Sequence, residues 1–235
     1  MADRERAAFE LMLVHNLKAP LTGIVALLEM LHDGDLGDLT DTQRSAVREM
    51  QAHGAEMVKM IDELVDLRHA RSSLFAVNRT PIDAATFLRE MQSGWVGRLG
   101  RLTTSVEPGV PDLEADASIL RRVLDNLLMN ARVHAGQDTT VTLHAQRAGD
   151  AVHLTVADDG PGIPAPDAER VFEPFVTLSR QVESRNHGLG LAYCRAALAA
   201  MDGQITLKPT PRGATFVVAL PAAIPVTRQA AEQPR

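Results

Sequence analysis

The chain has 235 residues and a formal net charge of −6, and 45% of its residues are hydrophobic. This apolar content can build one large core or two smaller ones, and the negative charge excludes a general attraction to nucleic acid or anionic lipid. A single cysteine, Cys194, excludes an intrachain disulfide and a multi-thiolate metal site.

The N-terminal third predicts two long helices. Apolar residues recur there at three- and four-residue steps on one face: Leu13, Leu17, Leu21, Ile24, Leu28 and Leu31. After a turn at residues 32–40, with Asp41 as the candidate capping residue, a second stripe repeats near every 3.5 residues: Val47, Met50, Met57, Ile61 and Leu64. An antiparallel helical hairpin has little interior of its own, so we expect a homodimer with a dimeric four-helix bundle.

The rest of the chain mixes helices and strands. A linker near residues 71–81 is followed by expected helices at 83–93, 116–133 and 189–201, and by expected strands at 101–106, 139–146, 151–157, 203–208 and 214–220. This order predicts an α/β sandwich with helices on one face of a mostly antiparallel sheet. The chain is therefore expected to be a two-domain α+β protein, divided into residues 1–75, residues 76–222 and a flexible tail at 223–235.

No stretch of the sequence predicts a membrane anchor or a secretion signal. The apolar stretch at residues 21–31 is interrupted by polar residues and is far shorter than the roughly 20 residues of a membrane span. The charged N-terminus also lacks the layout of a signal peptide. We therefore expect a cytoplasmic protein with no direct membrane span.

His15 is a candidate nucleophile. On a helix it lies roughly 200° from Leu13 and Leu17, so it points outward when the apolar stripe points inward. A neutral imidazole nitrogen can attack a phosphoryl group. The small residues Ala19 and Ala26, with Thr22, share this face and would allow another protein to approach. A lone surface histidine is more often inert, so the pattern alone leaves both possibilities open.

Three later segments could together bind a phosphorylated ligand. Asp158 ends an expected strand, and Gly160 and Gly162 follow it, although an ordinary turn has the same composition. Gly188 and Gly190 open a helix, whose exposed N–H groups can hold an anion. Asn126 and Asn130 lie one turn apart on an apolar helix, and a Mg²⁺-nucleotide would supply partners for their amides.

In this order the segments resemble the bacterial two-component sensor histidine kinases from about residue 9 to residue 221. His15–Pro20 is similar to the H-box, Asn126–Asn130 to the N-box, Asp158–Gly162 to the G1 box, Glu169–Phe175 to the F-box, Gly188–Leu191 to the G2 box, and Gly213–Phe216 to the last G-box. The resemblance implies a Bergerat-type fold of the histidine kinase/GHKL ATPase type.

The resemblance also implies what each box would do. Asp158 would bind adenine, Asn130 would hold Mg²⁺, Gly188 and Gly190 would contact the phosphates of ATP, and Thr215 would lie near the adenine end. The other implied nucleotide contacts are Asn126, His134, Gly160, Gly162 and Leu189. Residues 176–187 would form a lid. His15 would take the phosphoryl group and pass it to an aspartate of a response regulator receiver domain, and a separate sensor or input protein would supply the stimulus.

Several residues depart from the family pattern. Asn16 stands where an acidic residue usually accepts the proton of the phosphoacceptor, so we expect slow autophosphorylation. Ala19 replaces the residue that often positions water for dephosphorylation of the regulator. Val133 replaces a basic residue of the N-box, where Arg132 could compensate. Arg185 and Asn186 replace lid glycines and suggest a stiffer lid.

Three other interpretations stay open on the sequence. The first is a degenerate kinase or histidine phosphotransferase that relays or docks without efficient ATP use, which Asn16 and Val133 favour. The second is a gyrase-like ATPase, but such enzymes resemble one another in a glutamate at the position of Asn126, so this chain favours transfer over hydrolysis. The third is a structural coiled-coil adaptor, which would leave the glycine boxes unexplained.

Overall fold

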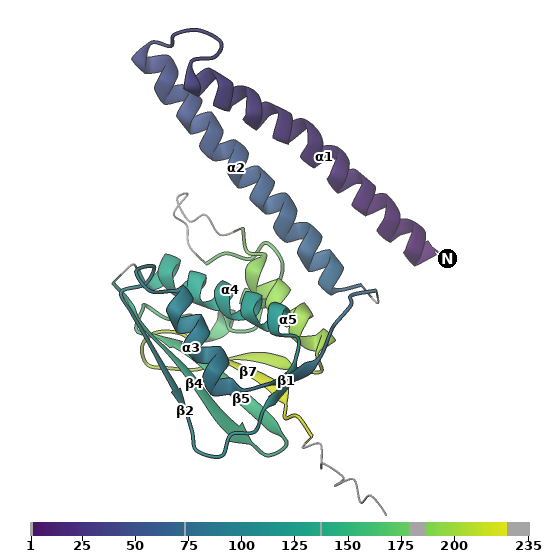
Figure 1. Cartoon of the computed structure of the whole chain (residues 1–235), viewed down its shortest axis with the longest axis vertical. Coiled ribbons are helices and arrows are strands. Elements are labelled where there is room, and N and C mark those ends of the chain that lie inside the picture. Colours follow the sequence, from purple (N-terminus) through teal and green to yellow (C-terminus); the bar gives the residue numbers. More distant parts are fainter. Residues whose placement is uncertain (1, 73, 137, 179–186, 225–235) are drawn as a thin grey trace, which may run out of the picture.

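The computed structural model describes residues 2–72, 74–136, 138–178 and 187–224, and for residues 2–17 it describes the backbone alone. Figure 1 shows a long helical hairpin beside an α/β sandwich. The hairpin consists of α1 (Ala2–Asp33) and α2 (Asp41–Ala70), and all described strands belong to the sandwich. The predicted two-part α+β fold is confirmed.

The hairpin begins its second helix one residue earlier than expected. Thr40, rather than Asp41, is the N-cap of α2. Its side chain accepts a hydrogen bond from the Gln43 backbone N–H, and the Gln43 side chain accepts one from the Thr40 N–H. This reciprocal capping box satisfies the N–H groups of Thr40 and Gln43. Asp41 is already the first residue of α2, so the prediction that it is the cap was wrong.

Close packing holds the two helices together along one side only. Leu21 and Leu28 of α1 are buried, as is Val47 of α2. A Cβ added to Gly54 would come within 2.7 Å of the Val25 side chain, so the helices approach closely there. Other apolar side chains of both helices stay exposed: Ile24, Leu27, Met30, Met50, Met57 and Met60. The hairpin therefore carries more apolar surface than the contact between its own helices covers.

A five-stranded sheet forms one layer of the sandwich. Its strand order is β2 (Arg101–Val106), β4 (Thr140–Ala148), β5 (Ala151–Asp158), β7 (Thr215–Pro221) and β6 (Gln204–Lys208). The β2–β4 pair is parallel and the other pairs are antiparallel. Two strands of three residues each, β1 (Thr80–Ile82) and β3 (Leu113–Ala115), pair with one another and escaped the sequence analysis.

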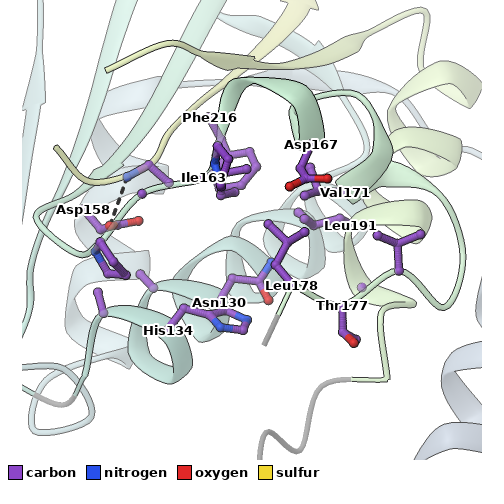
Figure 2. A pocket seen from close by; sticks show the side chains of 18 of the residues that line it. Asn130, His134, Asp158, Ile163, Asp167, Val171, Thr177, Leu178, Leu191 and Phe216 are labelled. Atoms are coloured by element: carbon purple, nitrogen blue, oxygen red, sulfur yellow. Dashed lines mark hydrogen bonds between the residues drawn. The ribbon is translucent and has the colours of Figure 1, made fainter. Parts of the chain in front are cut away.

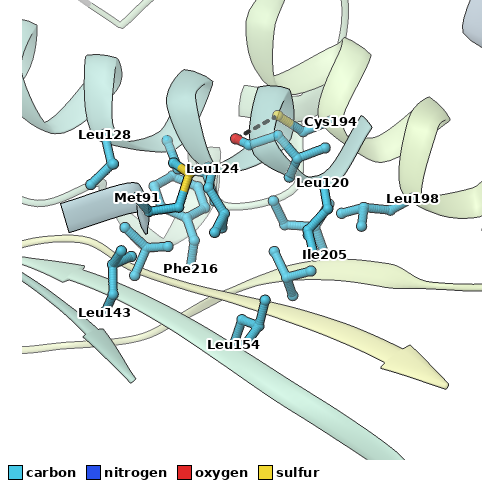
Figure 3. Packing of buried hydrophobic residues seen from close by; sticks show 14 of the residues in the cluster. Met91, Leu120, Leu124, Leu128, Leu143, Leu154, Cys194, Leu198, Ile205 and Phe216 are labelled. Carbon is cyan, nitrogen blue, oxygen red and sulfur yellow. Dashed lines mark hydrogen bonds between the residues drawn. The ribbon is translucent and has the colours of Figure 1, made fainter. Parts of the chain in front are cut away.

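Three helices cover one face of this sheet: α3 (Ala84–Gly94), α4 (Ala117–Ala135) and α5 (Gly190–Ala200) (Figure 1). Figure 3 shows Leu120, Leu124 and Leu128 of α4 pointing at sheet residues such as Leu154 and Phe216. These positions recur at the helical period on α4 and at alternate positions on the strands. The core thus fixes which side of α4 faces the sheet.

A capping aspartate fixes the start of α4. Asp116 is the N-cap of α4, and its carboxylate accepts hydrogen bonds from Asn78, Ser118 and Ile119. Burial raises the pKa of Asp116, but these bonds outweigh it and hold that pKa below its ordinary value. Cys194 of α5 is fully buried, and its thiol donates to the Val123 carbonyl.

The C-terminal end of the sandwich reaches slightly beyond the last strand. Ala223, which was expected to begin the tail, donates its backbone N–H to the Asp112 carbonyl at 2.7 Å. Residues 225–235 of that tail lie outside the described residues. Within the described part of the chain, no helix is both long and apolar enough to cross a membrane.

Candidate functional site

A cavity of about 440 Å³ lies at one end of the sandwich, between α4 and the loops that follow β5. Its wall includes side chains from α4, from the turn after β5, from the start of α5 and from the start of β7 (Figure 2). Six predicted site residues line it: Asn130, His134, Asp158, Gly162, Gly188 and Gly190. Segments more than 80 residues apart in the sequence therefore meet at one cavity.

Asp158 is held in a fixed orientation at the end of β5. Its Oδ1 atom accepts hydrogen bonds from the backbone N–H groups of Gly160, at 2.9 Å, and Ala214, at 3.1 Å. Figure 2 shows the second of these bonds beside the cavity. No described residue donates to Oδ2. One carboxylate oxygen thus anchors the side chain, and the other remains available as an acceptor.

Glycines allow the backbone to close around Asp158. Gly213 has φ +73°, and a Cβ there would come within 1.8 Å of the Asp158 carbonyl oxygen. A Cβ on Gly160 would lie 2.4 Å from that of Ala135. Any side chain at these positions would push α4 or the start of β7 away from the turn. The sequence finds Gly160 through the motif, and the contact explains why glycine is needed there.

The start of α5 forms the opposite end of the cavity. Its N-cap residue, Leu189, has no side-chain hydrogen bond to the helix, so no side chain of the cap occupies the first N–H groups. Gly188 has φ +68°, and a Cβ there would lie 2.6 Å from the Val176 carbonyl oxygen. The Phe175 backbone N–H donates to the Gly188 carbonyl at 3.0 Å. This bond links the residues on either side of the segment 176–187. Residues 179–186 of the expected lid lie outside the described residues.

Two predicted nucleotide contacts point elsewhere. Leu189 is fully buried and packs against Leu67 of α2 and Ala192, so it does not face the cavity. Thr215 is also absent from the cavity wall, whereas its neighbours Ala214 and Phe216 line it. Successive strand residues point to opposite faces of a sheet, which turns Thr215 away. Both residues sit in the expected motifs, but the cavity is lined by their neighbours.

The two amides of α4 have different surroundings. Asn130 lines the cavity and is engaged within the chain. Asn126 donates to the Arg122 carbonyl at 3.0 Å and lies in a neighbouring cleft, where its Oδ1 would be 2.9 Å from a Cβ on Gly190. No cluster of three or more His, Cys, Asp or Glu residues that could hold a metal occurs in the described ranges. An amide oxygen beside an anion site instead suits Mg²⁺ that arrives with phosphates.

The remaining wall is suited to a flat apolar group. It includes Ile163, Val171, Leu191 and Phe216, none of which the motifs singled out as ligand contacts. In the sequence, these four residues could be noticed only as part of the apolar pattern that predicts the core. Partial desolvation lowers the pKa of His134, and the negative charge of Asp158 opposes this shift. The His134 ring is therefore expected to be neutral near pH 7.

The predicted phosphoacceptor lies on α1, away from this cavity. The backbone of His15 and Asn16 is helical, and their side chains lie outside the described part of the chain. The neighbours expected on the same outer face, Ala19, Thr22 and Ala26, are exposed.

Comparison with known proteins matches both parts of the chain. Residues 5–73 match the His Kinase A (phospho-acceptor) domain, and residues 115–224 match the histidine kinase-, DNA gyrase B- and HSP90-like ATPase family. The alginate biosynthesis sensor protein KinB of Pseudomonas aeruginosa is 29% identical over 93% of this chain and 37% of its own length. The adaptive-response sensory kinase SasA of Synechocystis is 29% identical over 89% of this chain and 57% of its own length. The chain therefore spans less than two thirds of these relatives.

Solved structures have the same architecture. Full-length ShkA in complex with AMPPNP matches with a TM-score of 0.76 and 26% identity, covering 93% of this chain and 46% of that one. Histidine kinase ThkA in complex with the response regulator protein TrrA matches with a TM-score of 0.65, covering 94% of this chain and 66% of that one. At 17% identity, the second match bears on the fold alone.

Proposed function

Because the chain belongs to the two-component sensor histidine kinases, we propose that it binds ATP beside Asp158, phosphorylates its own His15, and passes the phosphoryl group to an aspartate of a response regulator. The observation that carries this proposal is the Asp158 carboxylate, which two backbone N–H groups fix at the cavity wall. The finer steps follow from the chemistry of the residues around it.

Asp158 would select adenine over guanine. Its Oδ2 atom is an acceptor, so it can take a hydrogen bond from the exocyclic amino group of adenine. Guanine carries a carbonyl oxygen at the corresponding ring position, and two acceptors facing one another repel. The apolar wall that includes Ile163 and Phe216 would hold the purine ring, as in most nucleotide pockets.

The start of α5 would hold the phosphates. Its free N–H groups and the positive end of the helix dipole favour an anion, and Gly188 and Gly190 leave room for it. Asn130 would contribute an amide oxygen to Mg²⁺, which when bound neutralises phosphate charge. Gly160 would act indirectly by orienting Asp158, and Gly162 and His134 would complete the wall.

His15 would be the acceptor. An unprotonated ring nitrogen attacks the γ-phosphorus, the new N–P bond forms, and the bond to ADP breaks as ADP leaves. Asn16 can orient the ring but cannot readily accept its proton, which supports a slow reaction.

The uncovered apolar stripe of the hairpin supports a homodimer. Two hairpins would bury residues such as Ile24, Met50 and Met57 in a four-helix bundle. The small exposed face around Ala19 and Thr22 would then accommodate the receiver domain. We place the boundary between the dimerisation hairpin and the ATP-binding domain at residues 75 and 76, and expect a separate protein to supply the input.

Incubation with γ-labelled ATP and Mg²⁺ tests the reaction. Acid-labile, base-stable label should appear on the wild type and should be lost in both His15→Ala and Asp158→Ala. Nucleotide binding, measured separately, should survive in His15→Ala and fail in Asp158→Ala. A wild type that binds ATP but takes no label would instead support the degenerate relative, for which Asn16 and Val133 are the motivating residues.

A further inference from the structure

A second cavity, of about 520 Å³, lies between α2 and the ATP-binding domain. Asn130 and Gly190 line both this cleft and the nucleotide cavity, so the expected phosphate end opens toward α2. The cleft is flanked by an apolar contact in which Leu67 of α2 packs on Leu189 and Ala192. The ATP-binding domain is therefore docked on α2.

His187 occupies this contact in an unusual way. Its side chain is only 9% exposed, although it immediately precedes the loop residue Gly188. The Nδ1 atom lies 3.3 Å from Glu63 Oε2, and Nε2 lies 3.5 Å from Glu56 Oε1. Nε2 is buried and makes no hydrogen bond. Glu56 and Glu63 are two turns apart on α2, so the ring sits between two carboxylates.

This position is suited to the protonated ring. A neutral imidazole has one N–H donor, so one of its nitrogens would present a lone pair to a carboxylate. An imidazolium donates from both nitrogens and can face Glu56 and Glu63 at once. Histidine is also the side chain that ordinarily changes charge between pH 5 and 8. Docking of the domain should therefore be tighter when His187 is protonated.

The other charged groups at the cleft leave this bias in place. Lys59 pairs with Glu63 at 3.4 Å, and Asp62 pairs with Lys18 of α1. Asp66 pairs with Arg122 of α4, which also stacks on Tyr193. Arg98 and Asp125 line the same cleft from the ATP-binding domain. Among the described residues, His187 is the only group that pairs with Glu56.

The docked arrangement keeps the nucleotide cavity away from the phosphoacceptor of the same chain. Figure 1 shows α2 lying between α1 and the sandwich. Lys18 pairs with Asp62, so His15, one turn earlier on the antiparallel α1, lies level with the turn of α2 that carries Asp66. None of the described α1 side chains lines either cavity. Because α2 separates α1 from the sandwich, transfer to His15 within one chain would require the domain to leave α2.

We propose that His187, held between Glu56 and Glu63, is a proton-dependent latch that keeps the ATP-binding domain docked on α2 and restrains phosphorylation of His15. The proposal rests on the proposed kinase function for its effect on rate. The docking itself can be measured without any catalysis.

Energy transfer between two dyes measures docking directly. Cysteines introduced at the exposed positions Ser45 on α2 and Asp150 on the sandwich carry the dyes, and buried Cys194 does not react. Labelled chains are diluted in an excess of unlabelled chains, so that dimers carry one labelled chain. Transfer in the wild type should change as the pH rises from 6 to 8.5. At every pH, Glu63→Gln and His187→Asn should give the transfer efficiency that the wild type shows at pH 8.5. Glu49→Gln, which changes an exposed carboxylate of the same helix, should behave as the wild type.

Initial rates of autophosphorylation test the restraint. At pH 6.5, Glu56→Gln and Glu63→Gln should each be roughly two- to fivefold faster than the wild type, the change expected for one lost ion pair. The ratio should approach one at pH 8.5, and comparison at equal pH cancels every pH effect that the variants share with the wild type. ATP affinity should stay unchanged, because neither residue lines the nucleotide cavity.

Two outcomes would overturn the latch. One is energy transfer that does not depend on pH or on Glu63. The other is a rate that falls in Glu63→Gln while transfer changes as expected, since the docked arrangement would then be the productive one. If the wild type binds ATP but takes no label, the proposed kinase function fails, and the transfer measurement still decides whether the latch exists.

Discussion

Replacing Asp158 by Asn should separate nucleotide recognition from folding. The asparagine keeps an oxygen at the position of Oδ1, which accepts from Gly160 and Ala214. Its NH₂ group replaces Oδ2, so a donor would face the adenine amino group in place of an acceptor. A hydrogen bond to a charged group contributes roughly 1.5–3 kcal/mol. ATP should therefore bind about 10- to 150-fold more weakly.

Asp158→Ala provides the matched comparison. Alanine removes both acceptors and leaves the Gly160 and Ala214 N–H groups without a partner, at a cost of roughly 1–3 kcal/mol for each group. This variant should lose thermal stability as well as ATP binding, whereas Asp158→Asn should melt close to the wild type. Titration calorimetry with ATP and GTP, beside thermal melts, separates the two effects.

The result for GTP is the sharpest part of this test. The wild type should prefer ATP, and Asp158→Asn should lose that preference because its amide can donate to the guanine carbonyl. ATP binding in Asp158→Asn equal to that of the wild type would refute the adenine role. An equal loss of stability in the two variants would refute the assignment of Oδ1 as the structural acceptor.

Four further predictions concern other sites. Asn16→Asp should speed autophosphorylation, because a carboxylate can accept the imidazole proton; an unchanged or lower initial rate would count against that role. Gly213→Ala should lower stability by roughly 2–4 kcal/mol in thermal melts, since its φ of +73° and the Asp158 carbonyl leave no room for a Cβ. Burial raises the pKa of the Cys194 thiol to about 12, so a disulfide reagent should label it only after unfolding. Asp116 has a lowered pKa, so its carboxylate stabilises the fold above the ordinary aspartate pKa of about 3.9. This contribution is lost as the pH falls through the pKa of the folded state. Asp116→Asn should therefore make the stability of the protein depend less on pH in the acid range.

Long periodic elements could be predicted well from the sequence. The stripe on α4 and the alternation on β4 and β5 placed these elements within two residues of their observed ends. Their burial pattern follows directly from the helical and strand periods. The strands β1 and β3 have three residues each and are too short for any period to appear, so only their pairing with one another defines them.

The sequence could predict members of the cavity wall where the motif residue itself carries the binding chemistry. Asp158, Asn130, Gly188 and Gly190 all line the cavity. Leu189 and Thr215 do not line the cavity, and a motif does not record which way each side chain points. The contact of His187 with Glu63 was invisible for a different reason, since the two residues are more than 120 positions apart in the sequence.

The bond from Ala214 to Asp158 also has a consequence for biosynthesis. The Asp158 carboxylate is oriented by the Ala214 N–H group at the start of β7, which is synthesised after the other described strands. The helical hairpin is complete about 140 residues earlier and, like other N-terminal units, can fold first. On the proposed function, a nascent chain would therefore be able to pair with a partner hairpin before its nucleotide site is complete.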